Sequence, residues 1–367
     1  MEAMDLDRSF WSGRKVLVTG HTGFKGSWLS LWLETLGANV IGFSRSVPTE
    51  PSLYELAEVA SGIESVTGDI RDFERLSATI AQQRPDVVFH LAAQSLVRRS
   101  FHDPLGTYET NLMGTVHVLE AVRRAGEVRV LINVTTDKVY ENREWEWGYR
   151  EDEPKGGHDP YASSKACCEL ATEAYRRSFF SPSAGRDGHT GVASARAGNV
   201  IGGGDWAEDR LVPDFMRSAL AGRTLLVRNP NAIRPWQHVL NPLSGYLVLA
   251  QALWDDLDYA QGWNFGPEES DARPVRHVAD RLCDQWGGDL RWEVDALPQP
   301  HEAHYLKLDS SRARARLDWT PVWHLEEGLR RTVQWFQAFR DGEDIREFSL
   351  QQIEDFGADR SRSLAAA

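Results

Sequence analysis

The sequence alternates between short apolar runs and longer segments in which apolar residues recur on one face. The runs have the composition of strands buried on both sides of a sheet, and the longer segments have the period of helices. Strands are expected at 15–18, 39–43, 87–91, 130–132 and 192–196, with a further strand ending at 68–70. Helices are expected at 28–36, 108–124, 214–221 and 325–356. Strands that alternate with helices predict an α/β fold with a doubly wound, mainly parallel sheet.

A glycine-rich loop follows the first predicted strand. Gly20, Gly23 and Gly26 are spaced G-x-x-G-x-x-G and lead into the first predicted helix. Glycines let the backbone approach a pyrophosphate, and a helix N-terminus supplies amide donors and a positive dipole. The loop therefore predicts the dinucleotide cradle of a Rossmann-like domain, with a tight turn without ligand as the alternative. Lys25 belongs to this loop, and we expect it on the solvated surface rather than near phosphate.

Two residues beyond the second and third strands bear on the type of dinucleotide. Simple NAD sites carry an acidic residue at the end of the second strand, where it binds the ribose hydroxyls. Arg45 stands there instead and could pair with the 2′-phosphate of NADP or stack on adenine. Asp69 ends the third strand, and a cap for the helix that begins near Phe73 is an alternative to a ligand role. These residues leave NAD and NADP both open.

Polar residues mark the end of the strand at 130–132. Thr136, Asp137 and Lys138 stand together just beyond its apolar run. Because the side chains of a strand alternate, an extended chain would point Asp137 away from both neighbours. A single pocket for all three therefore requires the strand to break into a turn here.

A second reactive pair follows after a polar loop. If Pro160 begins a helix, Tyr161 and Lys165 lie at i and i+4 on one face. An ammonium close to a phenol favours the phenolate and so lowers the pKa of the phenol. A surface pair on a helix is the alternative, but the position behind the polar end of a strand favours a catalytic layout.

Composition limits the class of protein. The 367 residues are 41% hydrophobic and 26% charged, as in a soluble globular enzyme, and the net charge of −13 argues against a nucleic-acid partner. No run reaches membrane-spanning length and no signal peptide is visible, so we expect a cytoplasmic protein without a membrane partner. Three cysteines are too few for a disulfide framework.

Local charge adds a candidate anion site to this acidic chain. Arg210, Arg228 and Arg234 lie in expected loops, and a guanidinium fork binds a diphosphate better than an amine does. A solvated surface position is the alternative for each arginine. His301 and His304 lack a clear third ligand, so we predict no metal site.

Long, mutually ordered phrases resemble the nucleotide-sugar 4,6-dehydratases of the extended short-chain dehydrogenase/reductase superfamily. The resemblance covers roughly residues 10–356 and is closest to members that act on CDP-glucose. The phrases are TGHTGFKGSWLSLWL at 19–33, NREWEWGYRE at 142–151, GGHDPY at 156–161, RAGNVIGGGDWA at 196–207, RPWQHVL at 234–240 and HEAHYLKLD at 301–309.

This resemblance implies a lyase that uses NAD to convert CDP-glucose to CDP-4-keto-6-deoxyglucose and water in deoxysugar biosynthesis, although Arg45 keeps NADP open. It implies a dinucleotide-binding and catalytic domain at 10–196, to which segments at about 235–265 return. A smaller C-terminal part at 197–356 would mainly bind the nucleotide sugar. It also implies a homodimer through the helix at 108–124 and the helix of Tyr161, whereas a face buried within the chain would give helix 108–124 the same pattern.

The resemblance also assigns catalytic roles. Tyr161 would take the proton of the sugar's 4-hydroxyl, Thr136 would hold that oxygen, and Lys165 would lower the phenol pKa and bind the nicotinamide ribose. Asp137 would protonate the departing 6-hydroxyl. Lys138, where related dTDP-glucose enzymes carry glutamate, would be the C5 base in its neutral form or would stabilise the enolate.

Further binding residues follow from matched positions. Those implied for the cofactor are Gly20, Gly23, Phe24, Gly26, Arg45, Asp69, Ile70, Leu91, Ala92, Ala93, Tyr161 and Lys165. Those implied for the substrate are Gln94, Ser95, Asn199, Arg210, Arg234, His304 and Tyr305.

Other functions remain possible on the same residues. A nucleotide-sugar 4-epimerase or reductase needs no acid for elimination, so Asp137 and Lys138 argue against it. A 4,6-dehydratase for dTDP-, GDP- or UDP-glucose would need the same catalytic residues. A cofactor-sensing regulatory protein is the non-enzyme alternative, but silent relatives usually lose the Tyr or the Lys, and Tyr161 and Lys165 are both present.

Overall fold

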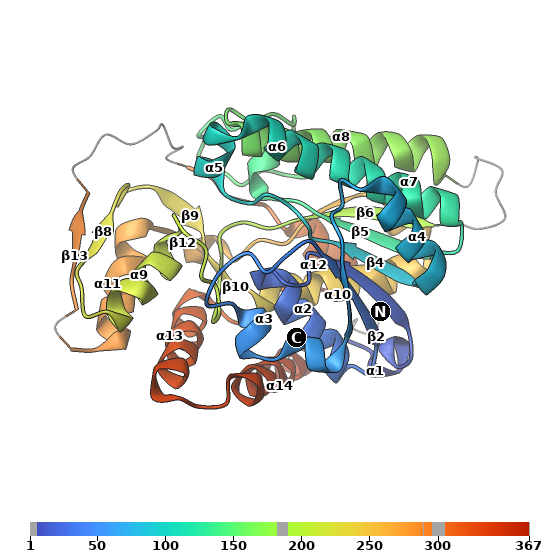
Figure 1. The fold of residues 1–367 in the computed structure, drawn as a ribbon. Helices are drawn as coiled ribbons and strands as arrows, with labels where there is room; N and C mark the ends of the chain where they lie inside the picture. Colours follow the sequence, from blue (N-terminus) through green and yellow to red (C-terminus); the bar gives the residue numbers. More distant parts are fainter. Residues whose placement is uncertain (1–5, 182–189, 289, 296–304, 367) are drawn as a thin grey trace.

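A seven-stranded parallel sheet forms the centre of the protein in the computed structural model, which describes residues 6–181, 190–288, 290–295 and 305–366 (Figure 1). The strand order is β11-β6-β5-β4-β1-β2-β3, and each neighbouring pair is parallel. This order confirms the predicted doubly wound α/β fold. The strands are β1 (Lys15–Thr19), β2 (Asn39–Ser44), β3 (Glu64–Thr67), β4 (Val87–His90), β5 (Val130–Val134), β6 (Gly191–Arg196) and β11 (Gly262–Asn264).

The strands β1, β4 and β5 are largely apolar and buried because helices cover both faces of the sheet, whereas the edge strand β3 is mostly exposed. Val130 and Ile132 of β5 belong to one buried cluster, whereas Leu131 between them belongs to the other. The first cluster includes residues of α2 (Phe24–Thr35) and α10 (Leu240–Asp255). The second includes residues of α4 (Phe73–Gln83) and α7 (Gly114–Ala125), with α8 (Pro160–Phe179) beside α7 on the same side (Figure 1).

Two predicted helices are interrupted in the structure. The helix expected at 108–124 begins as α6 (Pro104–Tyr108), passes through the π-helical turn η2 (Glu109–Met113) and continues as α7. The helix expected at 325–356 is divided into α13 (Leu325–Asp341) and α14 (Ile345–Ala366). Gly342 ends α13 at φ +77°, a conformation that favours glycine, and turns the chain back.

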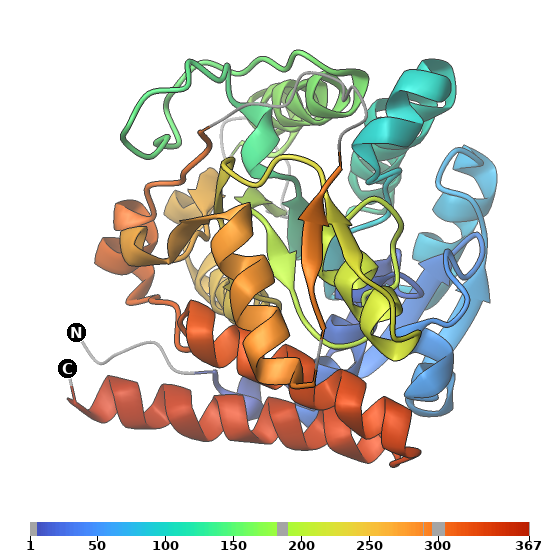
Figure 2. The ribbon, with the colours of Figure 1, turned by 90° about the vertical axis from the view of Figure 1, so that its left-hand side faces the viewer.

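The remaining elements lie mostly beyond the carboxyl edge of the sheet, and Figure 2 shows β13 beside β8 there. They include three two-stranded sheets: β7 (Val200–Ile201) with β10 (Gln237–His238), β8 (Leu225–Val227) with β13 (Trp292–Val294), and β9 (Ile233–Pro235) with β12 (Ala272–Pro274). The other helices are α1 (Arg8–Trp11), α3 (Leu53–Leu56), α5 (Val97–His102), α9 (Leu211–Leu220), α11 (Val275–Trp286) and α12 (Ser311–Leu317). The 3₁₀ turns are η1 (Val59–Gly62), η3 (Asp137–Val139), η5 (Leu257–Tyr259) and η6 (Glu269–Asp271).

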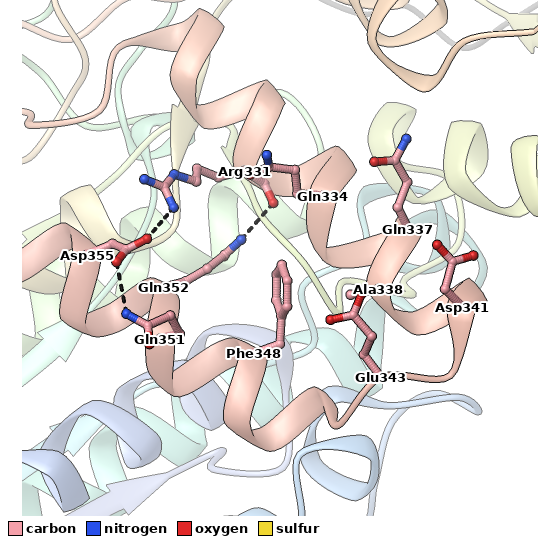
Figure 3. Close-up of a pocket in the computed structure, with 10 residues that line it drawn as sticks. All are labelled: Arg331, Gln334, Gln337, Ala338, Asp341, Glu343, Phe348, Gln351, Gln352 and Asp355. Carbon is pink, nitrogen blue, oxygen red and sulfur yellow. Dashed lines mark hydrogen bonds and ion pairs between the residues drawn. The ribbon is translucent and has the colours of Figure 1, made fainter.

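A polar cavity of about 370 Å³ opens between α13 and α14 (Figure 3). Charged and amide side chains surround Phe348, and Arg331 is paired with Asp355 at 2.5 Å. Both helices lie away from the end of β5, so this cavity is separate from the predicted catalytic residues. Among the described helices, none combines the length and the apolar character needed to cross a membrane.

Candidate active site

The strand that carries the polar triplet breaks at the predicted place. β5 ends at Val134, Thr136 is extended, and Asp137 begins the 3₁₀ turn η3. The Thr136 hydroxyl donates to Asp137 Oδ1 at 2.9 Å and accepts from the backbone of Lys138 at 3.4 Å. The backbone of Asp137 donates to the Ala197 carbonyl at 3.1 Å, which keeps the turn beside the chain beyond β6. The predicted turn is therefore confirmed.

Tyr161 and Lys165 lie together on the buried face of α8. Asp159 caps this helix by accepting from the Ala162 amide at 2.8 Å, and Pro160 occupies its first turn, as expected. Both side chains are more than nine-tenths buried. The helix thus presents a phenol and an amine toward the end of β5.

The electrostatics of this pair differ from the prediction. Burial raises the pKa of Tyr161 to about 12, while a hydrogen bond with Thr136 and the charge of Arg210 act in the opposite direction. Burial also lowers the pKa of Lys165, whose Nζ donates to the Val134 carbonyl at 3.2 Å. The expected lowering of the phenol pKa is absent in this structure because desolvation outweighs the nearby positive charge.

Asp137 presents one free carboxylate oxygen in the interior. The residue is 1% exposed, and its Oδ2 has no hydrogen-bond partner among the described residues. A Cβ atom at Gly198 would lie 3.2 Å from this oxygen and 2.5 Å from Pro235. Glycine at position 198 therefore leaves room beside the carboxylate.

Lys25 is placed differently from our expectation. Its side chain is partly buried rather than fully solvated, at the start of α2. Burial lowers the pKa of Lys25 to about 8, with Arg210 and Lys165 acting in the same direction and Asp137 and Asp205 opposing. The prediction of a solvated surface lysine is wrong because residues distant in sequence enclose this side chain. Lys25 is thus an additional amine at the candidate site.

The glycine-rich loop fits a dinucleotide. Gly20 has φ +78°, and a Cβ there would lie 2.7 Å from the backbone nitrogen of Ala92. A Cβ at Gly26 would lie 2.1 Å from the Gly20 carbonyl oxygen. The absence of side chains at both positions keeps the loop closed over the start of α2, where the first amides of a helix have no acceptor within the helix. The ring of Phe24 packs toward Gly202, so a role of this residue at the cofactor stays a prediction that concerns its backbone.

Charged residues meet beyond β2 and β3. Arg45 lies 3.6 Å from the Asp69 carboxylate, and Arg71 binds the same carboxylate through Nε and Nη2. Asp72 rather than Asp69 caps α4, by accepting from the Arg75 amide at 3.0 Å. The alternative of Asp69 as the helix cap is therefore wrong.

The chain directly after β4 carries three of the residues expected at the cofactor. Leu91, Ala92 and Ala93 are partly buried directly beyond this strand. Ile70 is buried on the other side and packs toward Gly114, where a Cβ would lie 2.4 Å from its side chain. The family resemblance assigns these residues to the cofactor, and this assignment stays a prediction.

Gln94 and Ser95 have partners within the protein. Gln94 closes its own turn, since Oε1 accepts from the Leu96 amide at 2.7 Å and Nε2 donates to Thr107 at 3.1 Å. Ser95 accepts from Arg210 Nη2 at 3.0 Å. Ser95 is therefore closer than Gln94 to the charged part of the expected substrate site.

Asn111 connects this turn to α8. It lies in the π-helical turn η2, and its side chain accepts from the Gln94 amide at 2.8 Å and donates to Ser164 at 2.9 Å. The sequence signal for it was weak, since an isolated asparagine in a helix is most often on the surface.

The other predicted substrate residues lie on the C-terminal part. Asn199 Oδ1 is buried without a hydrogen-bond partner among the described residues, whereas Arg234 is buried and donates to the Ile233 carbonyl at 2.9 Å. Arg210 also pairs with Asp205 at 3.0 Å. Tyr305 forms an isolated bridge with Ile233.

Two histidines of the sequence prediction cannot be placed. His301 and His304 lie outside the described residues. Within the described ranges, no group of three or more His, Cys, Asp or Glu side chains is arranged to hold a metal ion.

The fold and site define a class of protein. A glycine loop after β1, a Thr-containing turn after β5 and a Tyr-x-x-x-Lys helix around one parallel sheet are the arrangement of a dinucleotide-dependent short-chain dehydrogenase/reductase. Residues 17–332 match the family model described as GDP-mannose 4,6 dehydratase, and the chain belongs to this family of nucleotide-sugar dehydratases.

Individual relatives agree with this membership. The chain is 53% identical to a CDP-glucose 4,6-dehydratase of Salmonella typhimurium, over 96% of this chain and 98% of the relative. Its fold matches the structure of DesIV, a dTDP-glucose 4,6-dehydratase of Streptomyces venezuelae with NAD bound, with a TM-score of 0.74 and 26% identity over 90% of this chain and 98% of that one. A UDP-glucose 4-epimerase of Thermus thermophilus in complex with NAD gives 0.75 and 27% over 88% and 99%.

Proposed function

We propose that this protein converts CDP-glucose to CDP-4-keto-6-deoxyglucose and water. The observation that carries the proposal is the turn η3, which brings a carboxyl group with a free oxygen next to Thr136, close to Tyr161. A dehydratase needs an acid at this place for the departing hydroxyl, whereas an epimerase does not. The 53% identity to a CDP-glucose 4,6-dehydratase over 96% of this chain supports the choice of CDP-glucose.

The cofactor of the proposed reaction is NAD. When bound, NAD would supply a hydride acceptor for C4 of the sugar and the hydride for C6. Gly20, Gly23 and Gly26 would hold its pyrophosphate at the start of α2. Asp69 supports NAD over NADP, because a 2′-phosphate near Arg45 would also lie close to this carboxylate. Preferential binding of NADP by the purified protein would contradict this choice.

The first half-reaction needs a base and a fixed oxygen. Tyr161 would accept the proton of the 4-hydroxyl, and Thr136, whose proximity acts to lower the pKa of the phenol, would hold the sugar oxygen. Lys165 would bind the nicotinamide ribose and supply positive charge that stabilises the phenolate. The phenolate therefore has to be stabilised against the desolvation that now favours the phenol.

The second half-reaction removes water. The C4 ketone makes the C5 proton acidic, and Asp137 would protonate the departing 6-hydroxyl through its free Oδ2. Lys138 would take the C5 proton or stabilise the enolate from its place in the same turn. The partly neutral amine of Lys25 is a further basic group close to Asp137.

The nucleotide sugar would bind across the carboxyl edge of the sheet. Arg210 is positioned between Ser95 and Asp205, and we propose that it holds the diphosphate together with Arg234 and Asn199. Segment 197–356 would then serve mainly as the substrate-binding part, and 10–196 with about 235–265 as the catalytic part. The pairing of β11 with β6 supports such a return of the chain to the main sheet.

We further propose a homodimer through the helices next to Tyr161. Leu105 of α6 and Leu170 of α8 are 70% and 56% exposed, and Met113 and Phe179 on the same group of helices are also exposed. Large apolar side chains gathered on adjacent helices are typical of a protein interface. The predicted cytoplasmic location stays a prediction.

Incubation with CDP-, dTDP-, GDP- and UDP-glucose tests the proposed function directly. We expect a product 18 mass units lighter, formed fastest from CDP-glucose, with NAD as the added cofactor. Epimerisation without water loss would support the epimerase alternative, and cofactor binding without turnover of any sugar would support the regulatory one. Faster water loss from another nucleotide sugar would correct the base preference alone.

A further inference from the structure

A buried ion pair lies next to the catalytic turn, the segment of Thr136, Asp137 and Lys138 that contains η3. Arg196, the last residue of β6, donates from Nε and Nη2 to the two carboxylate oxygens of Glu169 on α8, at 2.9 and 2.8 Å. The two residues are only 3% and 5% exposed. Burial opposes ionisation of Glu169, but Arg196 outweighs it and lowers the pKa of the carboxyl group to about 2. The pair is therefore charged at neutral pH and fixed by two parallel hydrogen bonds.

Both ends of the catalytic turn are attached to this pair. Thr135, at the start of the turn, donates from its hydroxyl to Glu169 Oε1 at 2.5 Å. Tyr140, just after η3, accepts from Arg196 Nη1 at 2.7 Å. Its phenol in turn donates to Asn264 Oδ1 on β11 at 2.7 Å. The residues between these anchors are Thr136, Asp137, Lys138 and Val139.

The neighbouring strand leaves room for the guanidinium group. A Cβ at Gly262 of β11 would lie 2.4 Å from Arg196 Nη2. Two residues further, the Asn264 side chain donates to the carbonyls of Tyr149 and Asp309 at 2.8 and 3.0 Å. The ion pair thus joins β6 to α8 and to the segment just after β5, and its partner Tyr140 joins it to Asn264 on β11.

Stability alone does not account for such a pair. A buried salt bridge often contributes no more than well-packed apolar residues of the same volume, because both charges lose their hydration. Its distinguishing property is a fixed geometry, with hydrogen bonds in defined directions. This property suits a structure that has to hold reacting groups in place.

We propose that Glu169 and Arg196 are positioning residues that hold the catalytic turn in register with the helix of Tyr161. This inference rests on the proposed function, in which the turn carries the acid and α8 carries the base. Loss of one anchor displaces the whole turn, with both Thr136 and Asp137, relative to the sugar but leaves Tyr161 on its helix. Oxidation then loses part of the contact from Thr136 but keeps its base, whereas elimination loses the alignment of its acid. Elimination of water is then slowed more than oxidation at C4.

Removal of one hydroxyl group at a time tests this role. Tyr140→Phe and Thr135→Val each remove one anchor and keep the size of the side chain. Tyr149→Phe is the matched control, because Tyr149 stacks on Tyr140 at 5.2 Å while its hydroxyl contacts Asn142 and Arg143 rather than the ion pair. The three variants therefore separate loss of an anchor from loss of a buried phenol.

Single-turnover kinetics give the first readout. In Tyr140→Phe and Thr135→Val we expect water loss to slow at least ~10-fold, since displacement of a reacting group by about 1 Å can cost ~10²-fold. Oxidation at C4, followed as absorbance of the reduced cofactor, should slow clearly less than water loss, because Tyr161 stays in place on α8. Equal slowing of both steps would show a general structural role and overturn the proposal.

Amide hydrogen exchange gives a second readout that needs no turnover. Exchange in segment 136–140 should be faster in Tyr140→Phe and Thr135→Val than in the wild type, and unchanged in Tyr149→Phe. Unchanged exchange in both anchor variants would refute the positioning role. If the wild type removed no water from any nucleotide sugar, the proposed function would fail, whereas the exchange experiment would still decide whether the pair holds the turn.

Discussion

At the residue scale, burial of Tyr161 makes its phenol harder to ionise, which its position on α8 alone does not show. The phenol is buried, and burial raises its pKa to about 12 although Thr136 and Arg210 act against it. Tyr161 can accept a proton only as the phenolate, so the site has to stabilise this ionised form. Lys165 on the same helix face is the residue placed to do so.

Replacement of the phenol tests the assignment of the base. We expect Tyr161→Phe to lose ~10²–10⁴-fold in turnover, the usual contribution of a positioned base, while folding and cofactor binding persist. Water loss from CDP-glucose measures turnover, and fluorescence titration with NAD measures cofactor binding. Retention of more than about a tenth of wild-type turnover would contradict the role, because that loss lies far below the usual range.

Asp137 separates the dehydratase from the epimerase. Asp137→Asn keeps the shape of the side chain but removes the transferable proton, so oxidation at C4 remains possible. We expect this variant to reduce its cofactor on meeting CDP-glucose and to lose water at least ~10²-fold more slowly, within the range of general acid catalysis. Rapid-quench mass spectrometry follows the water loss. Near-normal loss of water would remove Asp137 from the mechanism.

The place of Lys25 in the glycine-rich loop at the start of α2 leads us to expect a pH dependence of cofactor binding. Its pKa is lowered to about 8, so the free protein loses this positive charge as the pH rises through 8. A bound diphosphate favours the charged form, and NAD affinity should therefore fall above pH 8. Lys25→Arg should keep its affinity there, because a guanidinium stays charged, and Lys25→Met should bind weakly at both pH 7 and pH 9. Equal affinity of the wild type at pH 7 and pH 9 would show that Lys25 does not contact the cofactor's phosphates.

At the element scale, the sequence was informative where one local rule determines the structure. Apolar runs located the main strands, Pro160 marked the start of α8, and the alternation of side chains required the turn after Val134, which the structure confirms. The interruption of helix 108–124 by η2 was not foreseen, since its apolar period continues through the π-helical turn. The partial burial of Lys25 depends on the Asp205–Arg210 loop, which no local pattern connects to the glycine loop.

The N-terminal cap of α8 offers a test at this scale. Asp159 accepts from the Ala162 amide at 2.8 Å, and Asp72 caps α4 in the same way at 3.0 Å to Arg75. We expect Asp159→Ala and Asp72→Ala each to lower the free energy of unfolding by about 1 kcal/mol, as for other helix caps. Urea denaturation measures this loss.

Only one of these caps is next to a reacting group. Tyr161 lies two residues after Asp159, so kcat should fall in Asp159→Ala and stay unchanged in Asp72→Ala. Equal kcat values in the two variants would show that the start of α8 is held by its packing rather than by its cap.

At the scale of the whole molecule, the sequence predicted the strands of the main sheet better than the short strands of the three two-stranded sheets. Apart from the three-residue β11, the strands of the main sheet are four to six residues long, whereas the strands of the pairs β7–β10, β8–β13 and β9–β12 have only two or three residues. Such short segments have no period of their own, and partners far along the chain define them. The division into a catalytic and a substrate-binding part came from the family resemblance for this reason.

The proposed dimer gives the last prediction. Leu170 lies on the outer face of α8 and is 56% exposed, and Leu226 on β8 is 59% exposed at a distance from these helices (Figure 1). A charge at either position should leave the stability of the single chain nearly unchanged, since surface substitutions usually alter it by within ~0.5 kcal/mol. In a dimer that buries α8, however, glutamate at position 170 would lose its hydration without a partner. We therefore expect Leu170→Glu to sediment as a monomer, while the wild type and Leu226→Glu sediment as dimers at the same concentration. Because α8 also carries Tyr161, kcat should fall in Leu170→Glu alone. A dimer of Leu170→Glu as stable as that of the wild type would place the interface on another surface.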